Sequence, residues 1–234
     1  MTTEFSLYRG RDPRELPAYS IADAARYVDV PRTTLRSWVA GRTYPRRDDI
    51  GTFESLITPA DPQTNRLSFY NLVEAHVLRA LRNQHAVPLQ HIRPAITYAE
   101  NALGISRLLL SRDLLTSAGQ VFVEHLEQLI NLSKSGQLYV KELLDNHLKR
   151  VEWDDRAIPI RLFPFIGHST ASLDKPIVID PNIGFGRPTV SGSGIFTSVL
   201  VQRIDAGESV EDLAKDYGLP EEQIKAAVLF EQAA

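Results

Sequence analysis

Apolar residues at helical spacing follow a polar leader. Ile21, Ala24, Ala25 and Val28 recur at intervals of three and four, which predicts a helix over 21–28. Ser20 is its expected N-cap, with Asp23 at the carboxylate position of a capping box. After Asp29-Val30-Pro31, a second helix is expected over 32–40, ended by Gly41. Two short helices joined by such a turn are the geometry of a helix-turn-helix.

A hairpin, or wing, is expected next. Phe53, Leu56 and Ile57 indicate one strand and residues 66–69 a second, with Thr58-Pro-Ala-Asp-Pro as the turn between them. Ser68 then caps a longer helix over 69–85, and Pro88 opens another that extends to about residue 102. The helix pair, the wing and these two helices are predicted to form one domain, residues 1–103.

The pattern changes twice more along the chain. In 104–167 we expect strands at 121–123 and 129–132, a helix over 137–151 and a half-buried strand over 158–165, together a small α+β connecting or dimerisation unit. In 168–234 we expect a short strand at 176–180, a glycine-rich loop over 182–194, and helices near 195–206, 209–217 and 220–232. The predicted fold class is therefore mainly α with small β elements (α+β).

Charge is distributed unevenly, although the net charge is only −3. Between residues 31 and 47 every charged residue up to Arg47 is an arginine, whereas from residue 204 onward acids greatly outnumber the two lysines. A chain with no cysteine has no disulfide, thiolate metal site or cysteine nucleophile. Neither a secretory signal nor a membrane span is recognisable, so we expect a soluble, cytoplasmic protein without a membrane partner.

The second helix has the composition of a DNA-reading helix. Leu35, Trp38 and Val39 fall on its inner side, which leaves arginine and hydroxyl side chains toward solvent. Arginine recognises guanine through two hydrogen bonds, and hydroxyls suit phosphates or bases. Operator DNA is therefore the expected partner, bound by Arg32, Thr33, Thr34, Arg36, Ser37, Arg42, Arg46 and Arg47. A helical hairpin with a solvated basic face is the alternative.

The segment YSIADAARYVDVPRTTLRSWVAGRTY, followed after the hairpin by LSFYNLVEAHVLRALRNQHAVPLQHIRPAI, resembles a MerR-type winged helix-turn-helix. In that family the second helix enters the major groove and the wing contacts the DNA backbone. The resemblance implies the same roles for the second helix and the wing of this chain.

The C-terminal part resembles the DUF433 family, small three-helix domains similar to the antitoxin halves of bacterial toxin–antitoxin pairs. Its matching elements are Asp180-Pro181, Gly186-Arg187-Pro188, Gly192, Gly207, Asp212-Leu213-Ala214 and the run that begins at Gly218. The chain as a whole thus resembles a VapB-like, type II DUF433-domain antitoxin. That resemblance implies a PIN-like ribonuclease toxin as partner and repression of the antitoxin's own operon.

Charge argues that the two ends bind different partners. The last helix carries Glu221, Glu222 and Glu231 against Lys225, and phosphate repulsion makes it a poor reader of DNA. We expect these glutamates to contact protein, either a second copy in a homodimer or a basic toxin; a solvated face without a partner is the alternative.

The remaining patterns argue against catalysis. The glycine-rich loop lacks the lysine and Ser/Thr of a phosphate loop, and the histidines lack metal-ligand spacing. We therefore expect no enzyme activity, no catalytic residue, no cofactor and no metal. Two other functions stay open: a ligand-responsive MerR-like regulator whose 104–167 unit binds a small molecule, and an enzyme such as a hydrolase.

Overall fold

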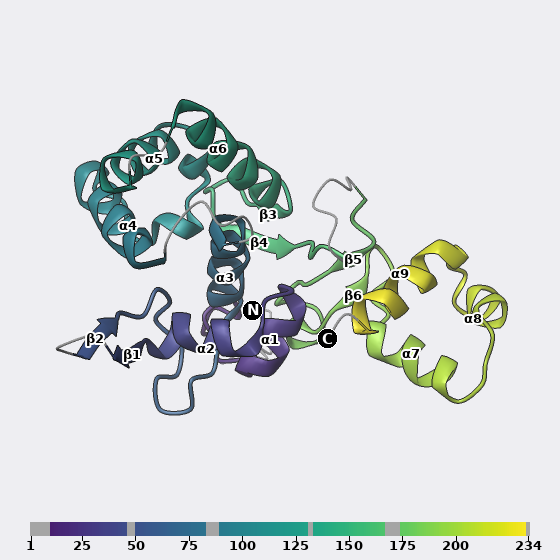
Figure 1. Cartoon of the computed structure of the whole chain (residues 1–234). Helices are drawn as coiled ribbons and strands as arrows, with labels where there is room; N and C mark the ends of the chain where they lie inside the picture. Colours follow the sequence, from purple (N-terminus) through teal and green to yellow (C-terminus); the bar gives the residue numbers. More distant parts are fainter. Residues whose placement is uncertain (1–9, 46–49, 83–88, 131–132, 167–173, 233–234) are drawn as a thin grey trace, which may run out of the picture.

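The centre of the molecule is one fully buried helix. The computed structural model describes residues 10–45, 50–82, 89–130, 133–166 and 174–232. Every side chain from residue 69 to 81 of α3 (Phe69–Arg82) is buried, which is typical of a helix surrounded by other elements. In Figure 1, α3 stands between the N-terminal helices below it and a layer of three helices above it.

The predicted helix-turn-helix is present. It consists of α1 (Ile21–Tyr27) and α2 (Arg32–Ala40), within one residue of the expected bounds. Ser20 caps α1 as expected, because its Oγ accepts a hydrogen bond of 3.1 Å from the backbone N–H of Asp23. The wing follows as an antiparallel pair, β1 (Arg42–Pro45) and β2 (Ile50–Phe53).

The strands predicted for the wing are wrong in position. Neither 53–57 nor 66–69 forms a hairpin strand: β2 ends at Phe53, and Phe69 already begins α3. The backbone N–H groups of Leu56 and Ile57 instead donate to the carbonyl of Trp38, at 2.7 and 3.0 Å. Leu67 pairs with Tyr19 in an isolated bridge. The apolar residues used to predict the hairpin therefore anchor this connection under the helix-turn-helix core.

The layer above α3 is more helical than predicted. It contains α4 (Leu89–Leu103), α5 (Ser117–Ile130) and α6 (Lys134–Leu148), with two 3-10 turns, η1 (Leu108–Leu110) and η2 (Arg112–Leu115). The strand predicted at 121–123 is wrong, and so is the first half of the one at 129–132, because α5 occupies both; residues 131–132 lie outside the described residues. Ala118, Phe122 and Leu126 are buried at four-residue spacing, so the helical period prevailed over local β-propensity.

Two small hairpins lead from this layer to the C-terminal helices. The first is β3 (Val151–Trp153) with β4 (Pro159–Leu162), and the second is β5 (Ile177–Val178) with β6 (Thr189–Val190). Leu162 and Ile179 join them by two backbone hydrogen bonds of 3.0 and 2.8 Å. A 3-10 turn, η3 (Gly184–Gly186), lies in the predicted glycine-rich loop.

The three predicted C-terminal helices are present as α7 (Thr197–Asp205), α8 (Val210–Tyr217) and α9 (Glu221–Gln232). They form the group on the right of Figure 1. The fold is therefore mainly α with small β elements, as predicted. Across the described ranges, no helix combines the length and the apolar character needed to span a membrane.

Candidate nucleic-acid interface

Helix α2 presents one side to the core and the other to solvent. Leu35 and Trp38 are completely buried. On the opposite side Arg32, Thr33 and Arg36 are exposed, as a DNA-reading helix requires. The two other predicted residues of α2 lie at its edge: Thr34 and Ser37 are half-buried, and Ser37 Oγ donates a hydrogen bond of 2.8 Å to the carbonyl of Thr34.

The turn between α1 and α2 is held from beneath by a buried arginine. Asp29 occupies the left-handed region at φ +50°, and its carboxylate accepts a bond of 2.5 Å from Nη2 of Arg79 on α3. Arg79 is only 1% exposed; burial lowers its pKa and the Asp29 carboxylate counteracts that shift. This contact fixes the turn, and hence α2, to the central helix. The Arg79–Asp29 contact was not predicted from the sequence, because an aspartate at this position is typical of an ordinary turn.

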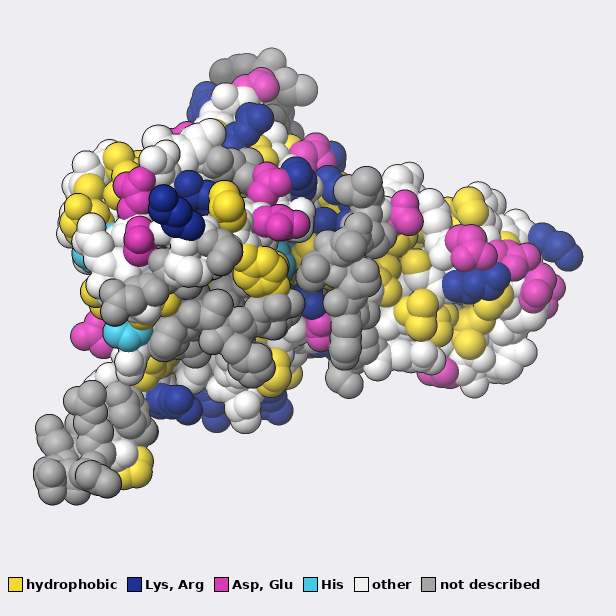
Figure 2. All heavy atoms as spheres, turned by 45° about the horizontal axis from the view of Figure 1, so that its top comes forward, with side chains coloured by type: hydrophobic (Ala, Val, Ile, Leu, Met, Phe, Trp, Pro, Cys, Tyr) yellow, Lys and Arg dark blue, Asp and Glu magenta, His cyan; other side chains and the backbone are white. Residues whose placement is uncertain are grey.

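The wing follows α2 directly in the sequence, after Gly41. Gly41 has a φ of +67°, and a Cβ at this position would lie 2.6 Å from the carbonyl oxygen of Phe53, so only glycine allows β2 to approach so closely. Arg42, at the start of β1, is exposed as predicted. Arg46 and Arg47 lie outside the described residues. Figure 2 shows Lys and Arg side chains gathered along the lower edge of the molecule, where the helix-turn-helix lies.

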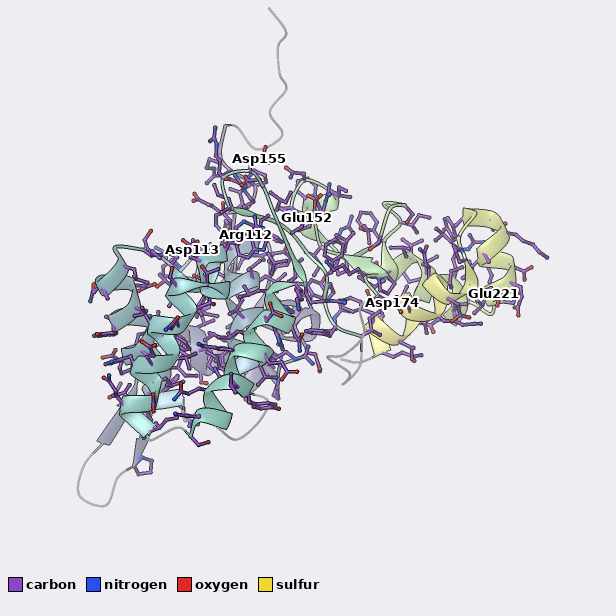
Figure 3. The ribbon with its side chains drawn as sticks, turned by 90° about the horizontal axis from the view of Figure 1, so that it is seen from above. Arg112, Asp113, Glu152, Asp155, Asp174 and Glu221 are labelled. Carbon is purple, nitrogen blue, oxygen red and sulfur yellow. The ribbon has the colours of Figure 1, made fainter. Side chains whose placement is uncertain are left out.

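The three glutamates predicted to contact a protein partner do not form one face. Glu221 and Glu222 lie at the start of α9, both paired with Lys225, at 3.2 and 3.1 Å. Figure 3 places Glu221 on the C-terminal helices, away from Arg112 and Asp113. Glu231 instead points inward, where its carboxylate pairs with Arg26 of α1 and accepts a hydrogen bond from Thr197 Oγ1. Of the three predicted residues, only Glu221 and Glu222 therefore lie together, in the first turn of α9.

The helix-turn-helix and the C-terminal helices are in direct contact. The rings of Tyr27 on α1 and Phe230 on α9 stack, with centroids 6.1 Å apart and an interplanar angle of 25°. Tyr19 Oη donates a buried hydrogen bond of 3.1 Å to the carbonyl of Gly186 in the glycine-rich loop. Two regions far apart in the sequence thus share a packed boundary, to which the Arg26–Glu231 ion pair also belongs.

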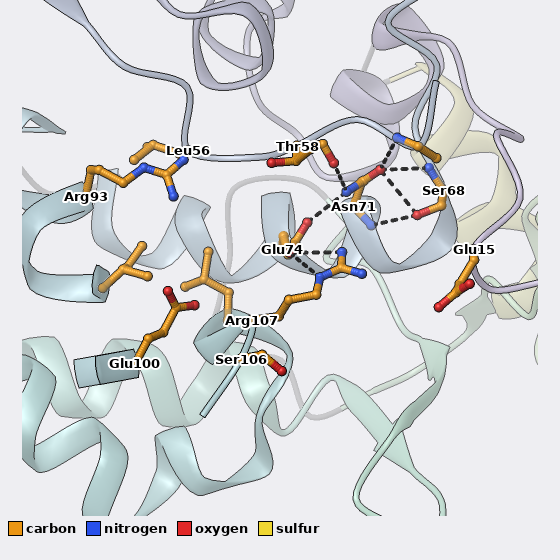
Figure 4. A pocket seen from close by; sticks show the side chains of 13 residues that line it. Glu15, Leu56, Thr58, Ser68, Asn71, Glu74, Arg93, Glu100, Ser106 and Arg107 are labelled. Carbon is orange, nitrogen blue, oxygen red and sulfur yellow. Dashed lines mark hydrogen bonds and ion pairs between the residues drawn. The ribbon is translucent and has the colours of Figure 1, made fainter. Parts of the chain in front are cut away.

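A cavity of about 570 Å³ lies between α3, α4 and the segment behind the wing. Figure 4 shows Glu74 at its wall, where Oε1 accepts a hydrogen bond of 3.0 Å from Nε of Arg107 and Oε2 accepts one of 2.9 Å from Nδ2 of Asn71. Burial raises the pKa of Glu74, and Arg107 opposes that shift. This site was not predicted from the sequence, where its one signal is a glutamate among the apolar residues of a long helix.

Acidic side chains near the β3–β4 hairpin are engaged in structural contacts. Glu152 and Asp180 both pair with Arg161, at 3.1 and 2.8 Å, and the Asp154 carboxylate accepts hydrogen bonds from the backbone N–H groups of residues 156 and 158. Glu152 and Asp155 are labelled on this hairpin in Figure 3. In the part of the chain that the structure describes, no group of three His, Asp or Glu side chains is placed to hold a metal ion.

This geometry defines a class of protein: a winged helix-turn-helix with an exposed arginine-bearing second helix, joined to a small C-terminal helical domain. Comparison with known proteins supports both parts. Residues 17–96 match a family described as "Putative DNA-binding HTH domain", and residues 177–230 match "Protein of unknown function (DUF433)".

Whole-chain comparisons agree with these matches. The chain is 31% identical to "Putative antitoxin VapB45" of Mycobacterium tuberculosis, over 92% of this chain and 93% of that protein. It is 24% identical to "Uncharacterized protein Rv2308" of the same organism, over 90% of this chain and 88% of that one. The crystal structure of Rv2018 from M. tuberculosis superposes with a TM-score of 0.65 at 26% identity, covering 91% of this chain and 98% of that chain. The chain belongs to the family of this putative antitoxin, VapB45, and itself carries a helix-turn-helix match and a DUF433 match.

Proposed function

We propose that this protein is a homodimeric antitoxin that binds its own operator through α2 and the wing, represses its operon, and neutralises a PIN-like ribonuclease toxin through the DUF433 domain. The observation that carries the DNA part is the exposure of Arg32, Thr33 and Arg36 on a helix whose other side is locked into the core. A two-fold dimer would present two such helices to paired half-sites. The likeness to a named antitoxin over nearly the whole chain supports the toxin part.

The DNA part is tested by binding to the region upstream of the operon, measured by electrophoretic shift. Arg36→Ala is expected to weaken operator binding by about 1–3 kcal/mol if the guanidinium contacts a base. Arg156→Ala is a matched control, because Arg156 is also exposed but lies on the β3–β4 hairpin, and the DNA binding of this variant should match wild type. If Arg32→Ala and Arg36→Ala together leave the shift unchanged, α2 is not the recognition helix.

The toxin part is tested by co-expression with the neighbouring open reading frame. The expected result is rescue of growth and co-purification of the two proteins. Reversing the charge of both Glu221 and Glu222 to lysine should weaken co-purification while operator binding persists; Glu211→Lys, an exposed change on α8, is the control. A neighbour that is neither toxic nor co-purified would overturn the antitoxin assignment.

A ligand-responsive regulator without a toxin is the second candidate, favoured by the cavity beside Glu74. The cavity lies between the segment that follows the wing and the helices α3 and α4, so a bound molecule would contact both this segment and these helices. The expected ligand site lay in 104–167, whereas this cavity is lined mostly by residues of the N-terminal domain. Thermal stabilisation by a metabolite, abolished by Glu74→Gln, would favour this candidate over the antitoxin.

A further inference from the structure

A short closed turn stands between the wing and α3. The N–H of Asp61 donates to the carbonyl of Arg66 at 3.1 Å, and Asn65 adopts a φ of +52°. The Asp61 carboxylate accepts hydrogen bonds from the backbone N–H of Gln63 at 3.0 Å and from Thr64 Oγ1 at 2.5 Å. These bonds lower the pKa of Asp61, so the carboxylate stays charged, and its oxygens already accept hydrogen bonds within the turn. The turn therefore holds Arg66 in a defined place.

The Arg66 side chain is oriented by backbone carbonyls on one edge. Nε donates to the carbonyl of Pro17 at 3.3 Å and Nη2 to that of Ala18 at 2.9 Å. Nη1 makes no hydrogen bond with any residue that the structure describes, and the residue is exposed. A guanidinium fixed along one edge keeps donors available on the other, and its orientation costs little further entropy on binding.

This side chain borders a groove of about 490 Å³ along α2. Arg32, Arg36 and Ala40 line it from one stripe of the helix, and Thr64, Asn65 and Arg66 line it from the turn. The start of α1 also lines the groove, with Ser20, Ile21 and Ala22. Three arginines and no carboxylate stand among the described residues of this lining, while the nearby carboxylates of Asp23 and Asp61 are hydrogen-bonded to Ser20 and Thr64.

We propose that this groove seats a phosphate of the DNA backbone, with Arg66 as a backbone contact separate from the wing. The inference rests on the proposed role of α2 as the recognition helix and adds a contact that no motif of the helix-turn-helix indicates. The groove is concave and cationic, and the guanidinium groups of its three arginines are the donors that a phosphodiester requires, whereas its two hydroxyls already donate to Asp23 and Asp61. The groove runs along α2 to Ala40, but Arg66 belongs to the turn before α3 and not to the wing, so it would contact the backbone from a different element.

Phosphate contacts have a signature that base contacts lack. Each neutralised phosphate releases condensed counterions, so removing one contact lowers the slope of log K against log salt by about one and weakens all sequences alike. We expect Arg66→Ala to reduce affinity roughly tenfold, and by the same factor for the operon's upstream region and for an unrelated duplex of equal length. Arg156→Ala, on the β3–β4 hairpin, should leave both affinity and slope unchanged.

Arg66→Ala also removes two hydrogen bonds to residues 17 and 18, so a second variant separates binding from folding. Asn65→Asp keeps a residue type that tolerates positive φ and adds a negative charge at the groove; it should weaken both duplexes and leave the denaturation midpoint near wild type. Wild-type affinity and salt slope in both variants would overturn the phosphate seat while the operator function stands. A loss confined to the operator, with an unchanged slope, would make Arg66 a base reader instead. If the wild-type protein binds neither duplex, the proposed function fails, and the phosphate seat fails with it.

Discussion

Two buried histidines make the stability of this protein sensitive to mild acid. His76 on α3 and His147 on α6 are 0% and 1% exposed, and their rings lie 5.0 Å apart beside Phe165. His76 Nε2 donates to the carbonyl of His147 at 3.0 Å, and His147 Nδ1 donates to the carbonyl of Leu143 at 2.9 Å. The second nitrogen of each ring is buried without a partner among the described residues. A proton added to either ring would therefore find no acceptor.

The size of the effect follows from the pKa values. Burial lowers the pKa of His147 from 6.5 to about 4 and that of His76 well below 6.5, and the nearby charges of Arg79 and Arg150 add to both shifts. In the unfolded chain both residues regain a pKa near 6.5, so below that pH the unfolded state binds more protons than the folded state. The stability these groups contribute is present above pH 6.5 and falls as the pH drops toward 4. For His147 the loss between pH 7.5 and pH 5 is about 2 kcal/mol, and His76, whose pKa is shifted in the same direction, adds to it.

Urea denaturation at pH 7.5, 6.5, 5.5 and 5.0 measures this loss, with His147→Leu as the comparison. The variant replaces the imidazole with an apolar side chain of similar volume and removes one titrating group, so its stability should fall by about 2 kcal/mol less than that of the wild type over the same range. Glu74 acts in the opposite direction, because burial raises its pKa and its contribution favours the folded state at lower pH. Since Glu74 is present in both proteins, it cancels in the difference.

The refuting result is equally specific. If wild type and His147→Leu lose the same free energy of unfolding from pH 7.5 to pH 5.0, His147 is not held neutral in the folded state. The buried histidine and arginine cluster would then need an internal anion or water to accept the extra protons.

Three further predictions concern the contacts that fix the helix-turn-helix and the C-terminal helices, each measured by urea denaturation at pH 7.5. Phe230→Ala should destabilise the protein by about 3–5 kcal/mol, because the ring is 2% exposed, whereas Leu229→Ala, at a 58% exposed neighbour, should change stability by less than about 0.5 kcal/mol. Asp29→Ala should cost about 2–3 kcal/mol, because Arg79 loses its partner in a buried position, and a cost as small as that of Asp205→Ala, at an exposed position of α7, would contradict the anchoring role of the pair. Ser209→Ala should cost about 1 kcal/mol, because Oγ accepts the N–H of Asp212 at the start of α8 and donates to its carboxylate; Ser209→Thr, which retains both the acceptor and the donor, should restore most of it.

Elements with a strong local signal were predictable from the sequence. The helix-turn-helix and the three C-terminal helices have a regular apolar spacing, Ser20 and Ser209 cap α1 and α8, and the structure reproduces the predicted bounds to within about two residues. The exposed side of α2 followed from the same spacing. These features depend on residues a few positions apart, which is the range over which periodicity carries information.

Features set by tertiary contact were not predictable in this way. Leu56, Ile57 and Leu67 resemble strand residues locally, but their backbone groups pair with Trp38 and Tyr19, which are distant in sequence. The burial of Glu231 depends on Arg26, 205 positions away, so charge counting alone placed it on an exposed acidic face. Likewise, Arg66 acquires its place at the α2 groove only through carbonyls 48 and 49 positions earlier.

Helix α9 offers a route by which a protein partner can influence DNA binding. Its first turn carries Glu221 and Glu222, and its last turns hold α1 through Phe230 and Glu231. A partner that displaced α9 would forfeit the burial of Phe230, whose loss we expect to cost about 3–5 kcal/mol, as well as the Arg26–Glu231 ion pair, worth about 1 kcal/mol. Contacts of this size allow a change in operator affinity of more than about a hundredfold, and by linkage DNA would change partner affinity by the same factor.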